Sequence, residues 1–325
     1  MTPPPVVSVL LPVRNGLPYL PVAVESVLQQ TFTNLEVLII DDGSTDGTAA
    51  WLQTLTDPRV RHLTPSTPGL ASALNTGLAA ARGRYVARQD ADDWSAPDRL
   101  ARQVAWLEAR PDVDVLATTV SFVDEAGRAV ESVWTETVRT QWDAAVTPAQ
   151  IAGLMPLTCC IFHATVLART AVLREAGGYD QATVPAEDYD LWLRLLPARR
   201  IARLPEALYT VRVHAASSSA VGRAAQLARV IEAKLRYVRR QVPDLPWPAR
   251  LVLPGDDRGA EVFREVGPAL GFVPVAAPPA MADVVAVTDF AAVPAFTAAL
   301  VEGGAFDVFG NVFVRRAPVP RAASA

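Results

Sequence analysis

Short apolar runs alternate with helical stretches in the first third of the chain. Residues 6–11, 35–40, 60–63 and 85–87 form these runs, which are mostly Val, Leu, Ile and Tyr. Continuous apolar runs of this length are typical of strands buried on both faces of a sheet. Between them, apolar residues recur at helical spacing, as at Leu70, Leu74 and Leu78. This order predicts an α/β protein with a doubly wound, mostly parallel sheet.

Carboxylates cluster directly after two of these strands. Asp41 and Asp42 follow the second strand, and Asp90, Asp92 and Asp93 follow the fourth. Parallel strands bring their carboxyl ends to one edge of the sheet, where open α/β sheets bind ligands. Crowded carboxylates repel one another, so a divalent cation is their expected partner, and Mn²⁺ or Mg²⁺ is usually held by one or two carboxylates plus substrate phosphates. The pattern therefore predicts a metal-assisted nucleoside diphosphate site.

The remainder of the chain predicts a second, smaller α/β unit. An amphipathic helix is expected over residues 222–242, a Pro-rich linker over 243–249, and a Rossmann-like accessory domain over 250–325, so that residues 1–242 form the main domain. Within the accessory domain we expect a helix at 293–301 and a strand at 308–314. Its loop at 255–259 lacks the third glycine of a dinucleotide fingerprint and contains two aspartates, so we expect no dinucleotide there.

Bulk composition excludes some classes of protein. The 30 basic and 34 acidic residues give a net charge of −4, which is too balanced for nucleic acid binding by overall charge. Cys159 and Cys160 are adjacent, so reduced thiols in a cytoplasmic protein are expected, and no leader or membrane span is predicted. The basic side chains of the 222–242 helix leave two interpretations: a solvated face, or contact with anionic lipid at the inner face of the cell membrane.

Six motifs, in order, resemble the family-two inverting glycosyltransferases with the GT-A fold. Together they span residues 6–220, roughly the first two thirds of the chain. The motifs are Val9-Leu-Leu-Pro-Val-Arg-Asn15, Ile39-Ile-Asp-Asp-Gly-Ser-Thr-Asp46, Asp90-Ala-Asp-Asp93 with Pro97, Gly177-Gly-Tyr-Asp180, Glu187-Asp-Tyr-Asp-Leu-Trp192, and Tyr209-Thr-Val-Arg-Val-His214 followed by Ser217.

The resemblance implies a role for each matching residue. The nucleotide-sugar pocket would contain Pro12, Asn15, Asp41, Asp42, Asp90, Arg212 and His214. Asp92 would bind the metal, supported by Asp93. Asp188 would be the general base that deprotonates an acceptor hydroxyl, with Glu187 and Trp192 in support. A single displacement would then invert the anomeric centre. The implied partners are a nucleotide-diphospho-sugar and a glycan or lipid-linked acceptor, in cell-envelope or polysaccharide biosynthesis.

Two positions depart from the family pattern. Ala164 follows His163 where a proline is common, so an acceptor-side role for His163 is only a partial match, and Leu74 stands where an arginine is common. Asp188 also has a simpler interpretation, as a carboxylate favoured by a helix N-terminus. Two alternative functions stay open: a nucleotidyltransferase, although the chain has no glycine-rich phosphate loop near its first strand, and a non-catalytic nucleotide-sugar-binding module.

Overall fold

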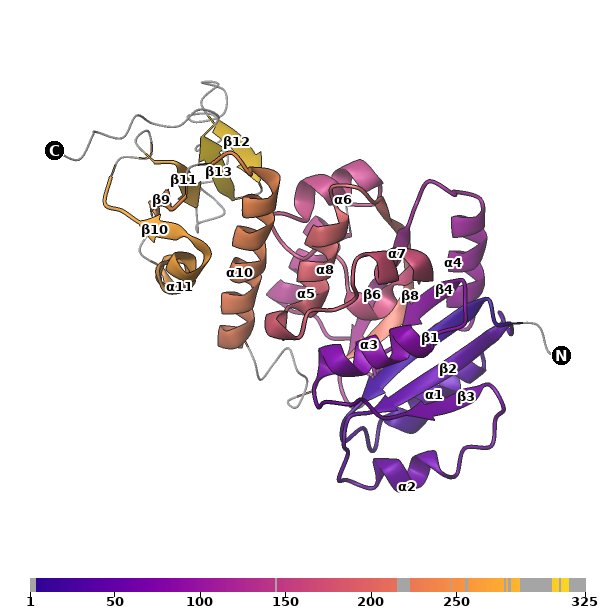
Figure 1. Cartoon of the computed structure of the whole chain (residues 1–325). Helices are drawn as coiled ribbons and strands as arrows, with labels where there is room; N and C mark the ends of the chain where they lie inside the picture. Colours follow the sequence, from indigo (N-terminus) through magenta and orange to yellow (C-terminus); the bar gives the residue numbers. More distant parts are fainter. Residues whose placement is uncertain are drawn as a thin grey trace. The chain divides into compact units, whose positions relative to one another are not determined.

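A computed structural model gives the fold of the chain as two compact units (Figure 1). The first comprises residues 1–152 and 160–221, and the second residues 153–159 and 222–325. The structure describes residues 4–143, 145–214, 223–245, 247–254, 257–277, 279, 282–286, 306–309 and 311–315.

The first unit contains an eight-stranded mixed sheet in the order β3-β2-β1-β4-β7-β6-β8-β5. Its strands are β1 (Val7–Val13), β2 (Leu35–Asp41), β3 (Val60–Leu63), β4 (Tyr85–Arg88), β5 (Trp94–Ser95), β6 (Val115–Val123), β7 (Leu167–Arg169) and β8 (Ile201–Arg212). β1 pairs in parallel with both β2 and β4, so the strand order reverses beside β1. Binding sites of open α/β sheets occur at this kind of reversal, outside the carboxyl ends of the strands.

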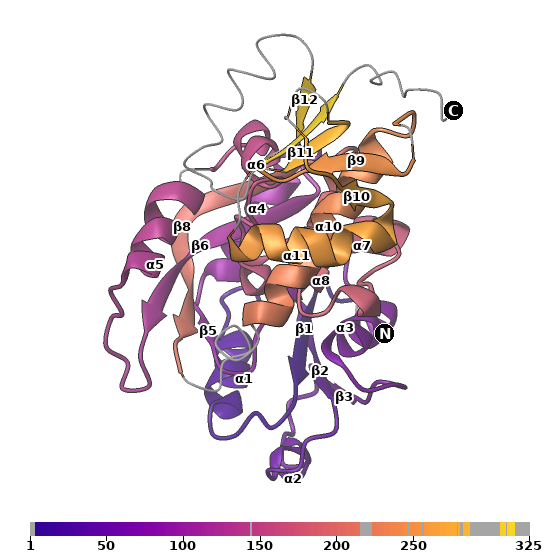
Figure 2. The same cartoon turned by 90° about the vertical axis from the view of Figure 1, so that its left-hand side faces the viewer.

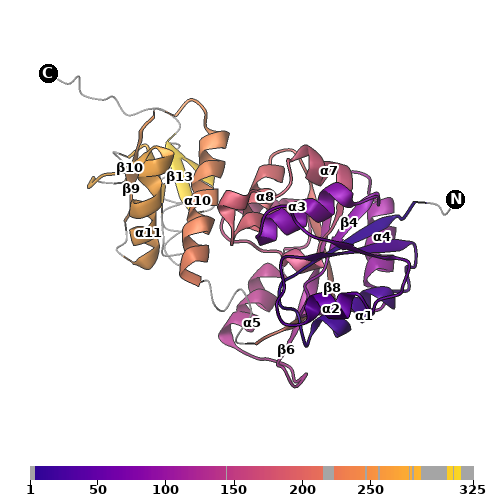
Figure 3. The ribbon, with the colours of Figure 1, turned by 60° about the horizontal axis from the view of Figure 1, so that its bottom comes forward.

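Helices cover both faces of the sheet because alternate strand residues point to opposite sides. The α-helices of this unit are α1 (Leu20–Leu28), α2 (Thr48–Leu52), α3 (Leu70–Ala80), α4 (Arg99–Glu108), α5 (Val133–Thr137), α6 (Pro148–Leu154), α7 (Thr170–Glu175) and α8 (Glu187–Leu195). Val9 and Leu11 share a core with α1 and α4. Leu10 and Ile40 face α3, where a side chain at Gly77 would come within 2.9 Å of each of them. Figures 2 and 3 show α1 and α3 on opposite sides of the sheet.

The mostly parallel sheet confirms the predicted fold class, and its second half departs from strict alternation. β7 is antiparallel to β4 and β6, and β5 is antiparallel to β8. β8 extends from Ile201 to Arg212 because it pairs along the length of β6, with a register irregularity near residues 118–120. Residues 120–158 contain the end of β6, then α5, the π-helix Val138–Trp142, and α6.

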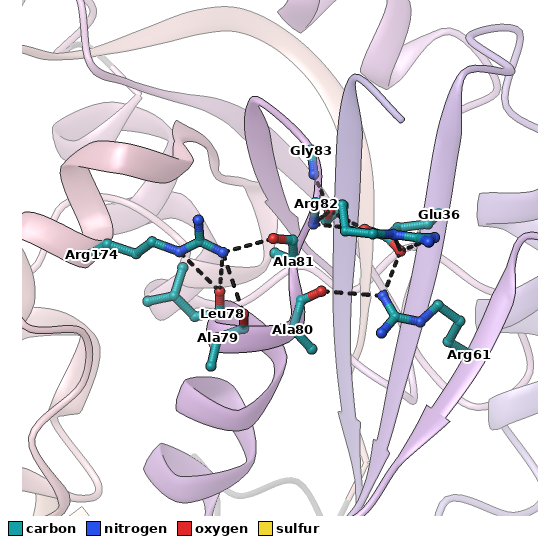
Figure 4. A network of polar contacts seen from close by, with 10 residues as sticks. Glu36, Arg61, Leu78, Ala79, Ala80, Ala81, Arg82, Gly83 and Arg174 are labelled. Atoms are coloured by element: carbon teal, nitrogen blue, oxygen red, sulfur yellow. Dashed lines mark hydrogen bonds and ion pairs between the residues drawn. The ribbon is translucent and has the colours of Figure 1, made fainter. Parts of the chain in front are cut away.

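At the edge where the strands begin, a buried carboxylate is fully engaged (Figure 4). Glu36 on β2 is 1% exposed and accepts hydrogen bonds from Ser8 Oγ at 2.7 Å and from the backbone N–H of Arg82 at 2.9 Å. The guanidinium groups of Arg61 and Arg82 lie 2.8 and 2.7 Å from its second oxygen. Burial raises the pKa of Glu36, but these hydrogen bonds outweigh it and hold the pKa below its ordinary value. Figure 4 also shows Arg174 bound to carbonyls at the end of α3.

The second unit contains a five-stranded mixed sheet in the order β10-β9-β11-β13-β12. Its strands are β9 (Ala249–Val252), β10 (Phe272–Pro274), β11 (Val284–Ala286), β12 (Phe306–Phe309) and β13 (Val312–Arg315), and its helices are α10 (Arg223–Gln241), α11 (Arg258–Val266) and the 3₁₀ helix Gly267–Leu270. The prediction of one strand at 308–314 is wrong: β12 and β13 are two antiparallel strands. The helix expected at 293–301 lies outside the described residues.

Helix α10 groups with this second unit. Ile231, Leu235 and Val238 share a core with Leu245 and the strands that follow. The sequence instead assigned the helix to the main domain and residues 243–249 to a linker, and that boundary stays a prediction.

Several basic side chains of α10 are used within the unit. Arg229 and Arg236 both pair with Glu232, and Arg239 stacks on Trp247 with 4.9 Å between the guanidinium carbon and the ring centroid. Lys234 is 6% exposed and donates to Leu157 O and Asn311 Oδ1. These contacts favour the interpretation of α10 as a packed helix over that of a lipid-binding one.

Candidate active site

The loops after β1 and β2 are joined by side chains at the carboxyl edge of the sheet. Asn15 adopts a left-handed backbone conformation with a φ of 55°, and its Oδ1 accepts a hydrogen bond from Thr45 N at 2.7 Å. Asp41 accepts from Ser44 N at 2.9 Å, and both oxygens of Asp42 accept from Gly69 N at 3.0 Å. Pro12 lies within β1. The structure thus gathers Pro12, Asn15, Asp41 and Asp42 around one loop pair, with Asp42 also holding the start of α3.

The pairing of β5 with β8 brings the acidic cluster to the end of β8. Trp94 pairs with Thr210, and the chain then places Arg212 and His214 beside the cluster. Asp93 Oδ1 accepts from Arg212 N at 2.8 Å, and Asp92 Oδ2 lies 2.8 Å from His214 Nε2. The Arg212 guanidinium lies between the rings of Tyr19 and Trp94, 4.6 and 5.0 Å from their centroids, and Nε donates to Asp92 O. Residues about 120 positions apart therefore form one cluster.

Asp92 and Asp93 differ in the size of their pKa shifts and in their exposure to solvent. Burial and the neighbouring charge of Asp90 raise the pKa of Asp92, whereas the contact with His214 opposes that rise. Burial, followed by the charges of Asp90 and Asp92, raises the pKa of Asp93 well above its ordinary value. Asp93 is only 5% exposed, so its position suits a structural contact with β8. The side chain of Asp92 is 34% exposed and is accessible to a ligand.

The donor set fits a divalent cation that is shared with a substrate. Across the described ranges, no three His, Cys, Asp or Glu side chains are grouped closely enough to hold a metal by themselves. Asp92 and His214 do supply a carboxylate and an imidazole side by side. Phosphate oxygens of a substrate complete such a coordination shell in many magnesium and manganese sites.

Helix α8 presents two adjacent carboxyl groups at its start. The loop before it turns at Gly177 and Gly178, with φ values of 79° and 69°, and a side chain at Gly178 would come within 2.4 Å of Asn75 Oδ1. Asn75 holds that loop through both the N–H and the carbonyl of Tyr179. Arg194 on α8 pairs with Asp190 at 2.7 Å and donates to Gly178 O at 2.6 Å. These contacts fix the orientation of the first turn of α8.

The two carboxyl groups differ in environment. Glu187 is 5% exposed, and its Oε2 has no hydrogen-bond partner in the described structure. Burial, followed by the charge of Asp188, raises the pKa of Glu187 to about 7. Burial also raises the pKa of Asp188 to about 6, opposed by the hydrogen bond from Tyr189 N and by the charge of Arg88. Near neutral pH, Asp188 is therefore mostly ionised while Glu187 retains much of its proton.

His163 contacts both the loop before α8 and α8 itself. His163 Nε2 is 2.8 Å from the Tyr179 hydroxyl, and its ring packs on Trp192 with centroids 5.9 Å apart. Burial and the charge of Arg88 lower the pKa of His163 well below its ordinary value. Trp192 is fully buried, and its Nε1 has no partner in the described structure. Leu74, which replaces the family's arginine, is buried in α3.

Sequence reasoning missed two residues of the site. Arg88 is 4% exposed and pairs with Asp90 at 2.5 Å, and the buried Tyr209 hydroxyl accepts from Asp90 N at 3.0 Å. A signal existed for Arg88, since it is a cation at the end of an otherwise apolar strand. Tyr209 lay within a quoted motif, but only the pairing of β8 shows where its hydroxyl points.

An exposed aromatic group adjoins the site along the chain. Trp134 on α5 is 45% exposed and is held edge-on by Phe122 and Phe162, with ring centroids 4.9 and 6.2 Å away. Phe162 immediately precedes His163. Edge-to-face contacts with two rings fix the orientation of the indole and leave part of it open to solvent.

Comparisons with known proteins agree with this fold. Open α/β sheets with this kind of reversal in strand order bind ligands outside the carboxyl ends of the strands. Among solved structures, the TarS 1–349 complex of S. aureus with UDP-GlcNAc covers 81% of this chain and 71% of that chain, with a TM-score of 0.57 and 21% identity. The mannosyltransferase PcManGT of Pyrobaculum calidifontis, in complex with GDP-Man and Mn²⁺, covers 94% and 80%, with a TM-score of 0.53 and 22% identity. These likenesses show the GT-A fold.

Sequence comparison then gives the family. The model "Glycosyl transferase family 2" matches residues 8–172. The putative glycosyltransferase EpsE of Bacillus subtilis is 36% identical over 216 residues, which are 64% of this chain and 73% of that protein. Chondroitin synthase of Escherichia coli is 32% identical over 219 residues, 66% of this chain but 30% of that protein. The chain belongs to glycosyl transferase family 2 and is a glycosyltransferase. No helix in the described part of the chain is long and apolar enough to cross a membrane.

Proposed function

We propose that this protein transfers a sugar from a nucleotide-diphospho-sugar to an acceptor hydroxyl by a single, inverting displacement. One observation supports this most directly: β4, which leads into Asp90, and α8, which carries Asp188, are linked by residues 163–166, because Arg88 N donates to Val166 O at 3.0 Å and the His163 ring packs on Trp192. A displacement needs the leaving group and the base on either side of one anomeric carbon.

On the donor side, the nucleotide lies against the loops after β1 and β2, near Asn15 and Asp42, and Asp90 takes the ribose. Asp92 and His214 hold Mn²⁺ or Mg²⁺. When bound, the cation supplies positive charge that stabilises the departing diphosphate. Arg212 lies beside Asp92 and adds a second positive charge near the phosphates. The manganese and GDP-mannose in the PcManGT structure support this assignment.

On the acceptor side, Asp188 acts as the general base. An alcohol is a weak nucleophile at neutral pH, and a carboxylate within hydrogen-bond reach accepts its proton as it attacks. A base with a pKa of about 6 is largely ionised at pH 7 and still has appreciable affinity for a proton. Glu187 and Trp192 support the position of this residue from the same helix.

The acceptor is a glycan or a lipid-linked glycan. Trp134, Phe122 and Phe162 offer an oriented aromatic surface on which the apolar face of a sugar ring can pack. The relative named chondroitin synthase supports a saccharide acceptor. The reaction then occurs in the cytoplasm, with residues 250–325 forming an accessory domain.

A thermal-shift screen tests the proposal. UDP-N-acetylglucosamine, GDP-mannose, UDP and GDP are each added with Mn²⁺ and with a chelator. We expect one nucleotide-sugar to raise Tm by several degrees, and only when Mn²⁺ is present. For the donor identified in this way, release of the nucleoside diphosphate and transfer of the sugar to an oligosaccharide are then measured. Binding without any turnover would favour the non-catalytic module, and pyrophosphate-dependent activity would favour the nucleotidyltransferase.

A further inference from the structure

Arg88 occupies a position between the two halves of the proposed site. It is the last residue of β4 and is 4% exposed. Nη2 pairs with Asp90 Oδ1 at 2.5 Å, and Nη1 donates to the carbonyl of Gln89. The strand itself is fixed there, because the N–H of Arg88 donates to Val166 O at 3.0 Å and its carbonyl accepts from Arg99 Nη2 at 2.8 Å. The guanidinium is thus anchored on the donor side.

The end of β4 is also joined to α8 through residues 163–166: Arg88 N donates to Val166 O, and the His163 ring packs on Trp192 of α8. The charge of Arg88 lowers the pKa of Asp188, of Glu187 and of His163. The Nε of Arg88 is buried and has no hydrogen-bond partner in the described structure. A buried cation with one free donor, surrounded by carboxyl groups on two different elements, is costly unless those groups offset its charge.

We propose that Arg88 is a positioning residue shared by the two halves of the site: it fixes Asp90 by an ion pair, and its positive charge stabilises the carboxylate form of Asp188. The inference rests on the proposed function, because it assumes that Asp188 is the base and that Asp90 contacts the donor. It adds an explanation of how a partly buried base remains ionised at neutral pH.

The groups that face Asp188 set the sign of the expected effects. Arg88 from β4 favours its ionised form, and so does the N–H of Tyr189 on its own helix. Asp90 from the loop after β4 and the neighbouring Glu187 carry opposing negative charge when ionised. Tyr179, from the loop before α8, is un-ionised because burial raises its pKa. Removing the positive charge should make Asp188 harder to ionise, and removing the charge of Asp90 should make it easier.

The test is the pH dependence of kcat/KM for UDP release from UDP-N-acetylglucosamine, or GDP release from GDP-mannose, with Mn²⁺. In Arg88→Gln the acid limb should move up by about one pH unit, so that activity at pH 6 falls about fivefold more than activity at pH 8. Arg88→Lys retains the charge, so its acid limb should stay in place while nucleotide-sugar affinity falls. Asp90→Asn should move the limb in the opposite direction, which keeps the test open if Arg88→Gln does not fold.

Arg203→Gln is the matched control. Arg203 is a buried arginine, 2% exposed, in the same unit, and it donates to the carbonyls of Ala145 and Cys160. Its loss should lower Tm and leave the acid limb unchanged. A uniform fall in activity for Arg88→Gln, with an unmoved acid limb, would show a merely structural role and overturn the inference. Asp188→Asn distinguishes failure of the Arg88 inference from failure of the proposed function. If this variant retains full transfer, the assignment of Asp188 as the base is wrong.

Discussion

Two buried glutamates at opposite edges of the same sheet have opposite surroundings. Glu36, where the strands begin, accepts hydrogen bonds from Ser8, Arg61 and Arg82, and its pKa is held below its ordinary value. Glu187, on the helix beside the strand ends, has a carboxyl oxygen without a partner, and burial raises its pKa to about 7. A satisfied buried charge can stabilise the fold, whereas an unsatisfied one costs stability.

The different surroundings of Glu36 and Glu187 indicate which edge of the sheet is arranged for stability and which for catalysis. At the first edge, each polar group of the cluster has a partner within the protein. At the second, the carboxyl groups of Asp92, Asp93, Glu187 and Asp188 are all harder to ionise than ordinary carboxyl groups. Clusters of perturbed carboxylates are a feature of functional sites. Substitutions at the two edges should therefore separate loss of stability from loss of activity.

The largest effect is expected at Asp188. Asp188→Asn should lower transfer by about 1000-fold, because general bases contribute roughly 100- to 10,000-fold. Tm should not fall, since the variant removes a partly buried carboxylate whose pKa is raised in the folded state. Steady-state kinetics and thermal denaturation measure both. Asp190→Asn, two residues further along the same helix, is the control: Asp190 pairs with Arg194, so this variant should lose stability and keep most of its transfer activity. Equal losses of activity in the two variants would contradict the comparison.

Glu36→Gln should have the opposite signature. Removing one partner from a buried ionic cluster costs about 3 kcal/mol in the free energy of unfolding. Well below the lowered Tm, kcat should stay close to that of the wild type. The Glu36 carboxylate has a lowered pKa in the folded state, so its contribution is fully present above the unfolded pKa and is lost as pH falls through the folded pKa. Urea unfolding at pH 7 and pH 3 should show a difference between variant and wild type that shrinks at the lower pH.

Asp92→Asn tests the metal at the strand-end edge. We expect transfer to fall by about 100-fold, which matches a loss of a few kcal/mol of charge stabilisation. Adding more Mn²⁺ should recover part of the rate, and a chelator should abolish it in the wild type. Asp98→Asn, at the exposed start of α4, offers a control carboxylate outside the cluster. If the wild-type rate were unchanged by the chelator, the proposed role of the metal would be wrong.

Much of the first unit could be predicted from the sequence. Continuous apolar runs located β1, β2, β3 and β4, and the carboxylates after β2 and β4 marked the binding edge, because both signals are local. The cluster around Asp92 could not be completed this way. Its partners Arg212 and His214 arrive through the antiparallel pairing of β5 with β8, a contact between residues about 120 positions apart. Only the resemblance to family motifs pointed to a role for these two residues.

The surroundings of buried charges also could not be predicted from the sequence. A pattern of residue types does not say whether a carboxylate finds partners, so Glu36 and Glu187 look alike in the sequence. Arg88 escaped notice because it belongs to a strand and not to a motif. β12 and β13 were taken for one strand because residues 308–309 and 312–314 are all Val or Phe, and only two residues separate them in the sequence.

The smallest expected effect is the change in stability caused by Glu187→Gln. It tests most directly whether Glu36 and Glu187 differ in the way their surroundings indicate. In the folded protein the Glu187 carboxyl has a pKa of about 7, above the ordinary value of 4.5, so the folded state binds this proton more tightly than the unfolded state. Its contribution to stability therefore falls as pH rises from about 4.5 to 7 and stays low above that range. Glu187→Gln removes the charge, so it should raise the free energy of unfolding by about 1 kcal/mol at pH 8 and change it little at pH 5.

Urea denaturation at the two pH values measures this difference, beside Glu36→Gln under identical conditions. The two variants should change stability in opposite directions at pH 8. If Glu187→Gln destabilised the protein as Glu36→Gln does, the carboxyl of Glu187 would have partners in solution that offset its burial. Glu36 and Glu187 would then differ only in their distance from Asp188. The raised pKa of Asp188 would also need a cause other than a poorly solvated pocket that it shares with Glu187.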